Sequence, residues 1–128
     1  MSSIDVVTEA YRFAKRAEHR KLRVLIADGA TWEPTEKKKW NACRDPEQIV
    51  RTLLWRTGSA NRMRPSDPLE FGQYAVIRLR GRRLERLGAR GFLVPRLYQV
   101  VEVKAGKIVR MRDYGSLKEA LAGTGHDS

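Results

Sequence analysis

The sequence predicts an α+β domain in which helices come first and a sheet of antiparallel strands follows. In the first half of the chain, apolar residues recur at three- and four-residue spacing, which is typical of helices. From residue 73 onward, apolar and polar residues alternate, which is typical of half-buried strands. The chain has 128 residues, of which 41% are hydrophobic, and this is enough for one core. We therefore expect a single domain over residues 1–128, with the helices packed on one face of the sheet.

The expected helices cover residues 3–19, 21–27, 45–58 and 116–122. Ser3 is the expected N-cap of the first helix, and Asp28-Gly29 is expected to end the second. The third helix has the clearest start, because Asp45 is followed by a proline at the first helical position and by Gln48 three residues after the cap. Beyond the last helix we expect a flexible tail over residues 122–128.

The expected strands cover residues 30–33, 73–80, 92–104 and 107–114. The last two are joined by Ala105-Gly106, which suits a two-residue hairpin turn. Residues 59–68 contain two prolines and are expected to form a connection, because proline interrupts a strand ladder.

Composition argues against several classes of protein. No apolar run approaches the roughly 18 residues of a membrane span, and the N-terminus does not have the layout of a signal peptide. The single cysteine, Cys43, cannot form an internal disulfide, which favours a reducing, cytoplasmic location. Two histidines and one cysteine, far apart in the chain, do not form a zinc motif, and Gly106-Lys107 lacks the rest of a phosphate-binding loop. We expect no membrane contact, no metal and no cofactor.

The chain is strongly basic, with 26 Lys and Arg against 15 Asp and Glu and a net charge of +11. Seven arginines and one acid fall between Arg78 and Arg96. This stretch contains one aromatic residue, Phe92, and is interrupted by glycines, whereas nucleic-acid sites usually interleave aromatics or present a helix. We expect a solvated hairpin there and no specific nucleic-acid binding. Weak, salt-sensitive attraction of polyanions remains a distant alternative.

Three stretches, taken in order, resemble the nuclear transport factor 2-like superfamily, and within it the SnoaL-like branch. They are ADGATWEP at residues 27–34, RDPEQI at 44–49 and YQVVEVKAGKIVRMRDY at 98–114. The resemblance implies a cystatin-like cone, in which a strongly curved antiparallel sheet wraps over the N-terminal helices. It also implies an apolar pocket at the open end of the cone, and often a homodimer. Because this superfamily contains both enzymes and binding modules, only the site residues can indicate function.

The limonene-epoxide hydrolases of this superfamily have their catalytic Asp in a Trp-Arg-Asp-Tyr stretch of the last strand. The matching stretch here is Met111-Arg112-Asp113-Tyr114, so the resemblance places Asp113 at the general-base position. Arg78 matches their catalytic arginine, but Arg80 stands where they have a second Asp. Their catalytic set is therefore incomplete in this chain.

The ketosteroid isomerases of the superfamily have a tyrosine on the first helix, and Tyr11 lies close to that place. Their general base is an Asp at a strand end, which is missing from Trp32-Glu33-Pro34. Their second acid falls at about Tyr98. The resemblance therefore argues against ketosteroid isomerase activity.

Strand alternation independently singles out Asp113, because it places this residue on the same face as Val109 and Met111. A carboxylate on an apolar face is costly unless it is paired or used. Arg78 is its candidate partner. Two interpretations stay open: a general base for acid/base chemistry, or one half of a structural ion pair.

The candidate ligand-binding residues are Tyr11, Trp32, Trp40, Tyr98 and Met111. The two tryptophans would give a pocket flat apolar walls, although core packing would also explain them. We expect binding of a small, largely apolar organic molecule. The catalytic hypothesis is an isomerase, lyase or epoxide-hydrolase reaction with Asp113 as base. The alternative is a ligand-binding or protein-interaction module without catalysis.

We predict a homodimer packed sheet to sheet. Both faces of the strand that includes residues 98–103 carry apolar side chains, and such sheets are usually covered on both faces. Light scattering at micromolar concentration should give twice the 14.7 kDa mass of one chain. The mass of a single chain would contradict the prediction.

Overall fold

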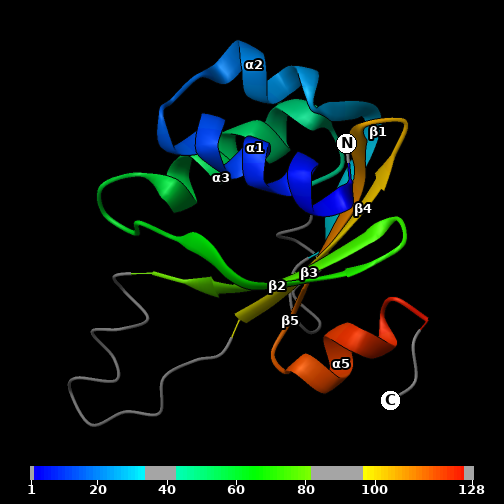
Figure 1. Ribbon diagram of the computed structural model, residues 1–128. Coiled ribbons are helices and arrows are strands. Elements are labelled where there is room, and N and C mark those ends of the chain that lie inside the picture. Colours follow the sequence, from blue (N-terminus) through cyan, green and yellow to red (C-terminus); the bar gives the residue numbers. More distant parts are fainter. Residues whose placement is uncertain (1, 34–42, 82–96, 126–128) are drawn as a thin grey trace, which may run out of the picture.

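The computed structural model describes residues 2–33, 43–81 and 97–125. The helices are α1 (Ser3–Lys15), α2 (His19–Val24), α3 (Pro46–Thr57) and α5 (Leu117–Ala122). The strands are β1 (Ile26–Glu33), β2 (Arg64–Phe71), β3 (Tyr74–Arg80), β4 (Leu97–Lys104) and β5 (Lys107–Tyr114). Helices α1, α2 and α3 lie on one side of the sheet, and α5 lies against the other side (Figure 1). No helix within these described ranges is long and apolar enough to cross a membrane.

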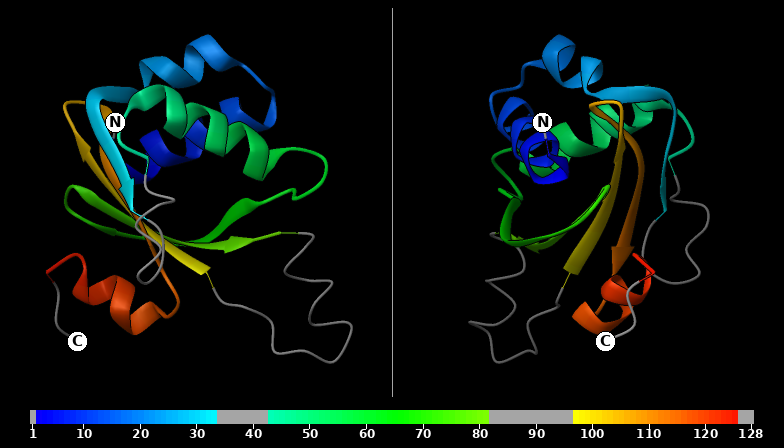
Figure 2. Two further views of the ribbon diagram at one scale, coloured as in Figure 1. Left: turned by 180° about the vertical axis from the view of Figure 1, so that it is seen from behind. Right: turned by 45° about the vertical axis from the view of Figure 1, so that its right-hand side comes forward.

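The five strands form one sheet in the order β1-β5-β4-β3-β2. The sheet is strongly curved around the helices, as the two views of Figure 2 show. This confirms the predicted α+β class with a curved sheet over N-terminal helices. One detail differs, because β1 pairs with β5 in parallel while the other neighbours are antiparallel. Strands β1 and β5 are far apart in the sequence, so no tight turn restricts their relative direction.

The helix starts follow local capping chemistry. The N-cap of α1 is Ser2, one residue earlier than expected, and it forms a capping box with Asp5. Asp45 caps α3 as predicted, and its side chain accepts a hydrogen bond from the Gln48 backbone N–H. The hairpin turn at Ala105-Gly106 is also confirmed, with positive φ at both residues, as a two-residue turn of this kind requires.

The expected end of the second helix was wrong. Helix α2 ends at Val24, and Asp28-Gly29 lies inside β1. Pairing with β5 makes β1 begin before the glycine, at Ile26, which pairs with Ile108. The Ile108 N–H also donates to the carbonyl of Leu25, just ahead of the strand. The first helix is likewise shorter than expected, because Ala17 adopts a positive φ of 54° and ends the helical path.

Residues 59–68 were expected to connect two elements, but strand β2 begins at Arg64 and includes Pro65 and Pro68. The strand tolerates both prolines because it is an edge strand of the sheet, where the outward side needs no ladder donors. Its pairing with β3 is interrupted between Ser66 and Leu69, and Asp67 there has a positive φ of 48°. The interruption marks a bulge, which also helps to protect an exposed edge.

The main core lies between the helices and the concave face of the sheet. Helix α1 packs its apolar stripe against β3, β4 and β5, and α3 packs its own against α1 and β1. The fully buried members include Val6, Val7, Ile49, Val50, Leu53, Ile77, Val101 and Met111. This layer is what places the C-terminal ends of α3 and β5 next to each other.

A smaller core lies on the convex face, where α5 covers part of the sheet. Val76 and Val100 are buried there together with Ala120. The dimer prediction depends on apolar side chains on both faces of the sheet, and part of one face is covered by α5 of the same chain. The homodimer stays a prediction. Two residues of the expected tail contact the fold, because Arg112 donates to the Gly123 carbonyl and Thr124 is buried.

Several expectations fall outside the described residues. They concern Trp40 and most of the loop before α3, the arginine-rich hairpin after Gly81, and the start of the strand expected from residue 92.

We predict that Leu53→Ala lowers the free energy of unfolding by about 2–5 kcal/mol, because Leu53 is fully buried in the main core and truncation leaves a cavity. The matched control is Leu69→Ala, at an exposed position of edge strand β2, which should change it by less than about 1 kcal/mol. Urea denaturation of both variants checks the prediction. Equal losses would show that the core is placed wrongly.

Candidate functional site

Asp113 lies near the end of β5, on the concave face of the sheet. Its register partner on β4 is Gln99, and both residues are buried. The side chain of Asp113 is only 2% exposed. Asp113 therefore points inward, as strand alternation predicted. The β5 residue that was expected on the same face, Val109, is replaced in the core by Ile108. The register shifts between Glu102 and Val103, and this bulge turns Val109 away from the core.

Three donors hold the Asp113 carboxylate. Oδ1 accepts hydrogen bonds from Trp32 Nε1 at 3.0 Å and from Gln99 Nε2 at 3.1 Å. Oδ2 accepts one from Arg56 Nη2 at 2.9 Å, which is also an ion pair. A buried carboxylate is stable in such a setting because each oxygen has lost water but gained a donor.

The partner of Asp113 is Arg56 of α3, and the expectation that Arg78 would pair with it was wrong. Arg78 pairs across the ladder with Tyr98, whereas Asp113 pairs with Gln99. Neighbouring positions along a strand point to opposite faces of the sheet. Arg78 therefore lies on the convex face and cannot reach the Asp113 carboxylate.

Two of the expected ligand contacts also lie elsewhere. Tyr98 shares the convex face with Arg78 and packs against the small core beside α5. Met111 points inward, but it is fully buried in the main core and is not among the residues that line the pocket. Alternation fixed which residues share a face, but it could not tell the concave face from the convex one or a filled interior from a cavity.

Tyr11 reaches the site through a second residue. Its hydroxyl donates to Gln99 Oε1 at 2.8 Å, and Gln99 in turn donates to Asp113. Burial raises the pKa of the Tyr11 hydroxyl well above its usual range, and the negative charge of Asp113 adds to this, while Arg56 acts in the opposite direction. Tyr11 is thus a neutral donor that fixes the orientation of the Gln99 amide.

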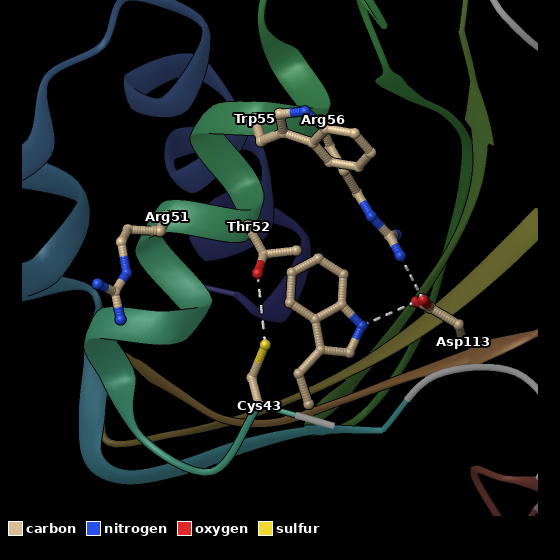
Figure 3. A pocket seen from close by; sticks show the side chains of 7 residues that line it. Cys43, Arg51, Thr52, Trp55, Arg56 and Asp113 are labelled. Atoms are coloured by element: carbon tan, nitrogen blue, oxygen red, sulfur yellow. Dashed lines mark hydrogen bonds and ion pairs between the residues drawn. The ribbon is translucent and has the colours of Figure 1, made fainter. Parts of the chain in front are cut away.

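A pocket of about 460 Å³ opens beside this carboxylate. Its described lining consists of Trp32, Cys43, Arg51, Thr52, Trp55, Arg56 and Asp113. Four of these come from α3, on the side away from the main core, and Figure 3 shows Asp113 facing them from β5. A cavity of this size fits a small organic molecule.

Trp32 has two roles in the pocket. Its ring nitrogen holds Asp113, and its ring lies under the Arg56 guanidinium, whose central carbon is 4.5 Å from the ring centroid. The indole is only 3% exposed, so it forms a wall that is itself fixed by packing. Its predicted place at the pocket agrees with this geometry, whereas Trp40 lies outside the described residues.

Sequence reasoning missed Arg56, Gln99 and Trp55 as site residues. A signal for Gln99 was present, since it is the polar member of an otherwise apolar alternating set with Val101 and Val103. For Arg56 and Trp55 the signal was weaker, because charged and aromatic residues on the outward side of a helix are usually solvated. Only the position of α3 over β1 and β5 gives them a site.

Cys43 lines the same pocket but is buried, with its Sγ 3.4 Å from Thr52 Oγ1. In the part of the chain that the structure describes, no three His, Cys, Asp or Glu side chains gather as metal ligands would. The charged chemistry of the described pocket therefore comes from Asp113 and two arginines.

Neither a protein-family model nor a curated protein sequence matches this chain. Solved structures do match. An NTF2-like protein of unknown function from Mesorhizobium loti has a TM-score of 0.68 at 17% identity, over 89% of this chain and 90% of its own. A protein of unknown function with a cystatin-like fold from Methylobium petroleophilum has a TM-score of 0.68 at 15% identity, over 98% and 91%. An LEH-like epoxide hydrolase from M. tuberculosis has a TM-score of 0.63 at 13% identity, over 94% and 87%.

These likenesses show that the chain has the NTF2-like fold, as its sequence resemblance implied. At such low identity they establish the fold alone, and activity must be argued from the residues of the pocket.

We predict that Tyr11→Phe lowers the free energy of unfolding at pH 7 by about 1–3 kcal/mol, because Gln99 Oε1 is left buried without its donor. The raised pKa of Tyr11 adds a pH dependence. Below about pH 10 both folded and unfolded wild type keep this proton; above it, only the unfolded state loses it. Wild-type stability then falls by up to about 1.4 kcal/mol per pH unit from this group, and the variant lacks that loss.

Urea denaturation at pH 7 and pH 11 measures this difference. The gap between wild type and Tyr11→Phe should narrow at the higher pH. Tyr74→Phe is the matched control, since Tyr74 lies half-buried on the convex side. A gap of equal size at both pH values would show that Tyr11 does not hold its proton as described.

Proposed function

We propose that this protein binds a small, largely apolar organic molecule in the pocket between α3, β1 and β5, and transfers a proton to or from it with Asp113 as the base. The observation that carries the proposal is the Asp113 carboxylate, which is buried, held by three donors and still part of the pocket lining. Fixed carboxylates of this kind suit proton transfer because no solvent shell must rearrange.

The two oxygens of Asp113 differ in what they can still accept. Oδ1 already accepts from Trp32 and Gln99, whereas Oδ2 accepts from Arg56 alone. A carboxylate oxygen has two acceptor positions, so Oδ2 is the atom with room for a proton. In the proposed step, a bound molecule or an activated water gives its proton to Oδ2, and the electron pair remains on the reacting atom.

Arg56 supports this step electrostatically. Its guanidinium is 2.9 Å from Oδ2, so a positive charge stands directly beside the carboxylate in a site that is largely removed from water. The same charge would stabilise negative charge that develops on the bound molecule. Arg56 thus takes the role that the sequence resemblance assigned to Arg78.

The reaction type is proposed at the level of isomerase, lyase or epoxide-hydrolase chemistry. The shared fold with an LEH-like epoxide hydrolase supports this range, and the aromatic walls favour a molecule with apolar surface. The second candidate function is a binding module without catalysis. What favours it is that three donors already hold Asp113, which is also what a purely structural buried acid needs.

We predict that Asp113→Asn reduces turnover about 100-fold or more while the chain still folds, because the substitution keeps the shape of the side chain but removes the base. Turnover is measured by mass spectrometry on a panel of small apolar epoxides, unsaturated ketones and hydroxy esters. Glu102→Gln is the matched control, because it removes a partly buried carboxylate from the neighbouring strand β4 outside the pocket.

Circular dichroism and the melting temperature are recorded for the same variants. Turnover of a wild-type substrate that is unchanged in Asp113→Asn would rule out Asp113 as the base. If wild type turns over no member of the panel but binds some of them, and Asp113→Asn only lowers the melting temperature, the binding module is the correct function.

A further inference from the structure

The charges that line the pocket do not balance. In the described lining, Arg51 and Arg56 carry positive charge, and Asp113 is the one acid against them. Asp113 is already paired with Arg56, so Arg51 adds an uncompensated positive charge beside an apolar cavity. A single carboxylate on a ligand would bring this described set to neutrality. The surplus matters because low-dielectric walls strengthen the attraction of an anion.

One nitrogen of Arg56 points to the same conclusion. The side chain is 18% exposed and uses Nη2 for Asp113. Its other terminal nitrogen, Nη1, is buried and has no hydrogen-bond partner among the described residues. A buried donor without an acceptor is unfavourable, and most such groups in folded proteins are satisfied. An acceptor oxygen supplied by a ligand would satisfy it once the Arg56 side chain turns this nitrogen toward the pocket.

Trp55 offers an apolar surface for the ring of a ligand. It lies one turn after Arg51 on α3, and although it lines the pocket it is 62% exposed. Figure 3 shows its ring on the same side of α3 as Arg56 and Asp113. A large indole at the rim of a pocket offers a flat surface on which a planar ring can stack. Trp32 provides a second, buried aromatic wall.

We propose that the ligand of this pocket is a planar aromatic or unsaturated organic acid, with its carboxylate on the Arg56 side, its ring against Trp55, and Arg51 adding a longer-range attraction from the other end of the lining. This rests on the proposed small-molecule function and narrows it to one chemical class. It also gives part of the net charge of +11 a role, because a basic protein raises the local concentration of anions near its surface.

The test compares each acid with its neutral isostere. Isothermal titration calorimetry is run on the full chain with benzoate, 2-naphthoate and 2-anthroate, and with the corresponding three amides. We expect at least one acid to bind about tenfold or more tightly than its amide, a difference of about 1.4 kcal/mol. Binding of that acid should weaken as salt is raised.

Two exposed lining residues then locate the binding. Arg51→Gln should weaken the acid about three- to tenfold and leave the amide unchanged, whereas Trp55→Ala should weaken both about tenfold. Arg20→Gln and Val24→Ala are the matched controls, since both residues are exposed on α2 and neither lines the pocket. Neither control should change the affinity.

The possible results distinguish a failure of the acid preference from a failure of the proposed small-molecule pocket. Equal affinity for acid and amide, with both weakened by Trp55→Ala, would overturn the acid preference and leave the small-molecule pocket in place. If Arg51→Gln and Trp55→Ala both leave the affinity for the acid unchanged, the acid binds outside this pocket. That result would also overturn the inference. If no acid and no amide binds, the inference fails, and the proposed function is decided by the turnover panel alone.

Discussion

The buried carboxylate of Asp113 is the interaction on which the rest of this structure depends. It joins β5 to β1 through Trp32, to α3 through Arg56 and to β4 through Gln99. Through Gln99 it also reaches α1, because Tyr11 donates to the same amide. Removing one partner of a buried ion pair typically costs about 3–5 kcal/mol. One charged group therefore fixes how three strands and two helices meet at this end of the sheet.

The same network explains why the pocket lies where it does. Apolar side chains pack between α1, α3 and the concave face and form the main core. The polar network begins where that packing ends, and the pocket opens beside it, between the outward side of α3 and Trp32. A site at the border between a rigid core and an open rim combines fixed catalytic groups with access for a ligand.

The sheet itself separates two kinds of surface. Its concave face carries the core and Asp113, while its convex face carries a second small cluster that α5 covers. Arg78 and Tyr98 lie on the convex side, although a resemblance to known enzymes had placed both in the active site. When identity is low, register in the sheet is a better guide to a residue's role than its place in an aligned sequence, because a shift of one position changes the face.

The sequence alone determined the α+β class, the hairpin at Ala105-Gly106, the cap at Asp45 and the inward direction of Asp113. These features depend on short-range rules, namely helical and strand periodicity, turn conformation and capping, which act over a few residues. The length of β1, the strand character of β2 and the bulge at Val109 were decided by pairing with distant strands. The partner of Asp113 was decided only by tertiary structure, because Arg56 is 57 residues away in the chain and no local pattern links the two. The packing of α3 against the sheet brings the two charges together, and that packing is a property of the whole fold.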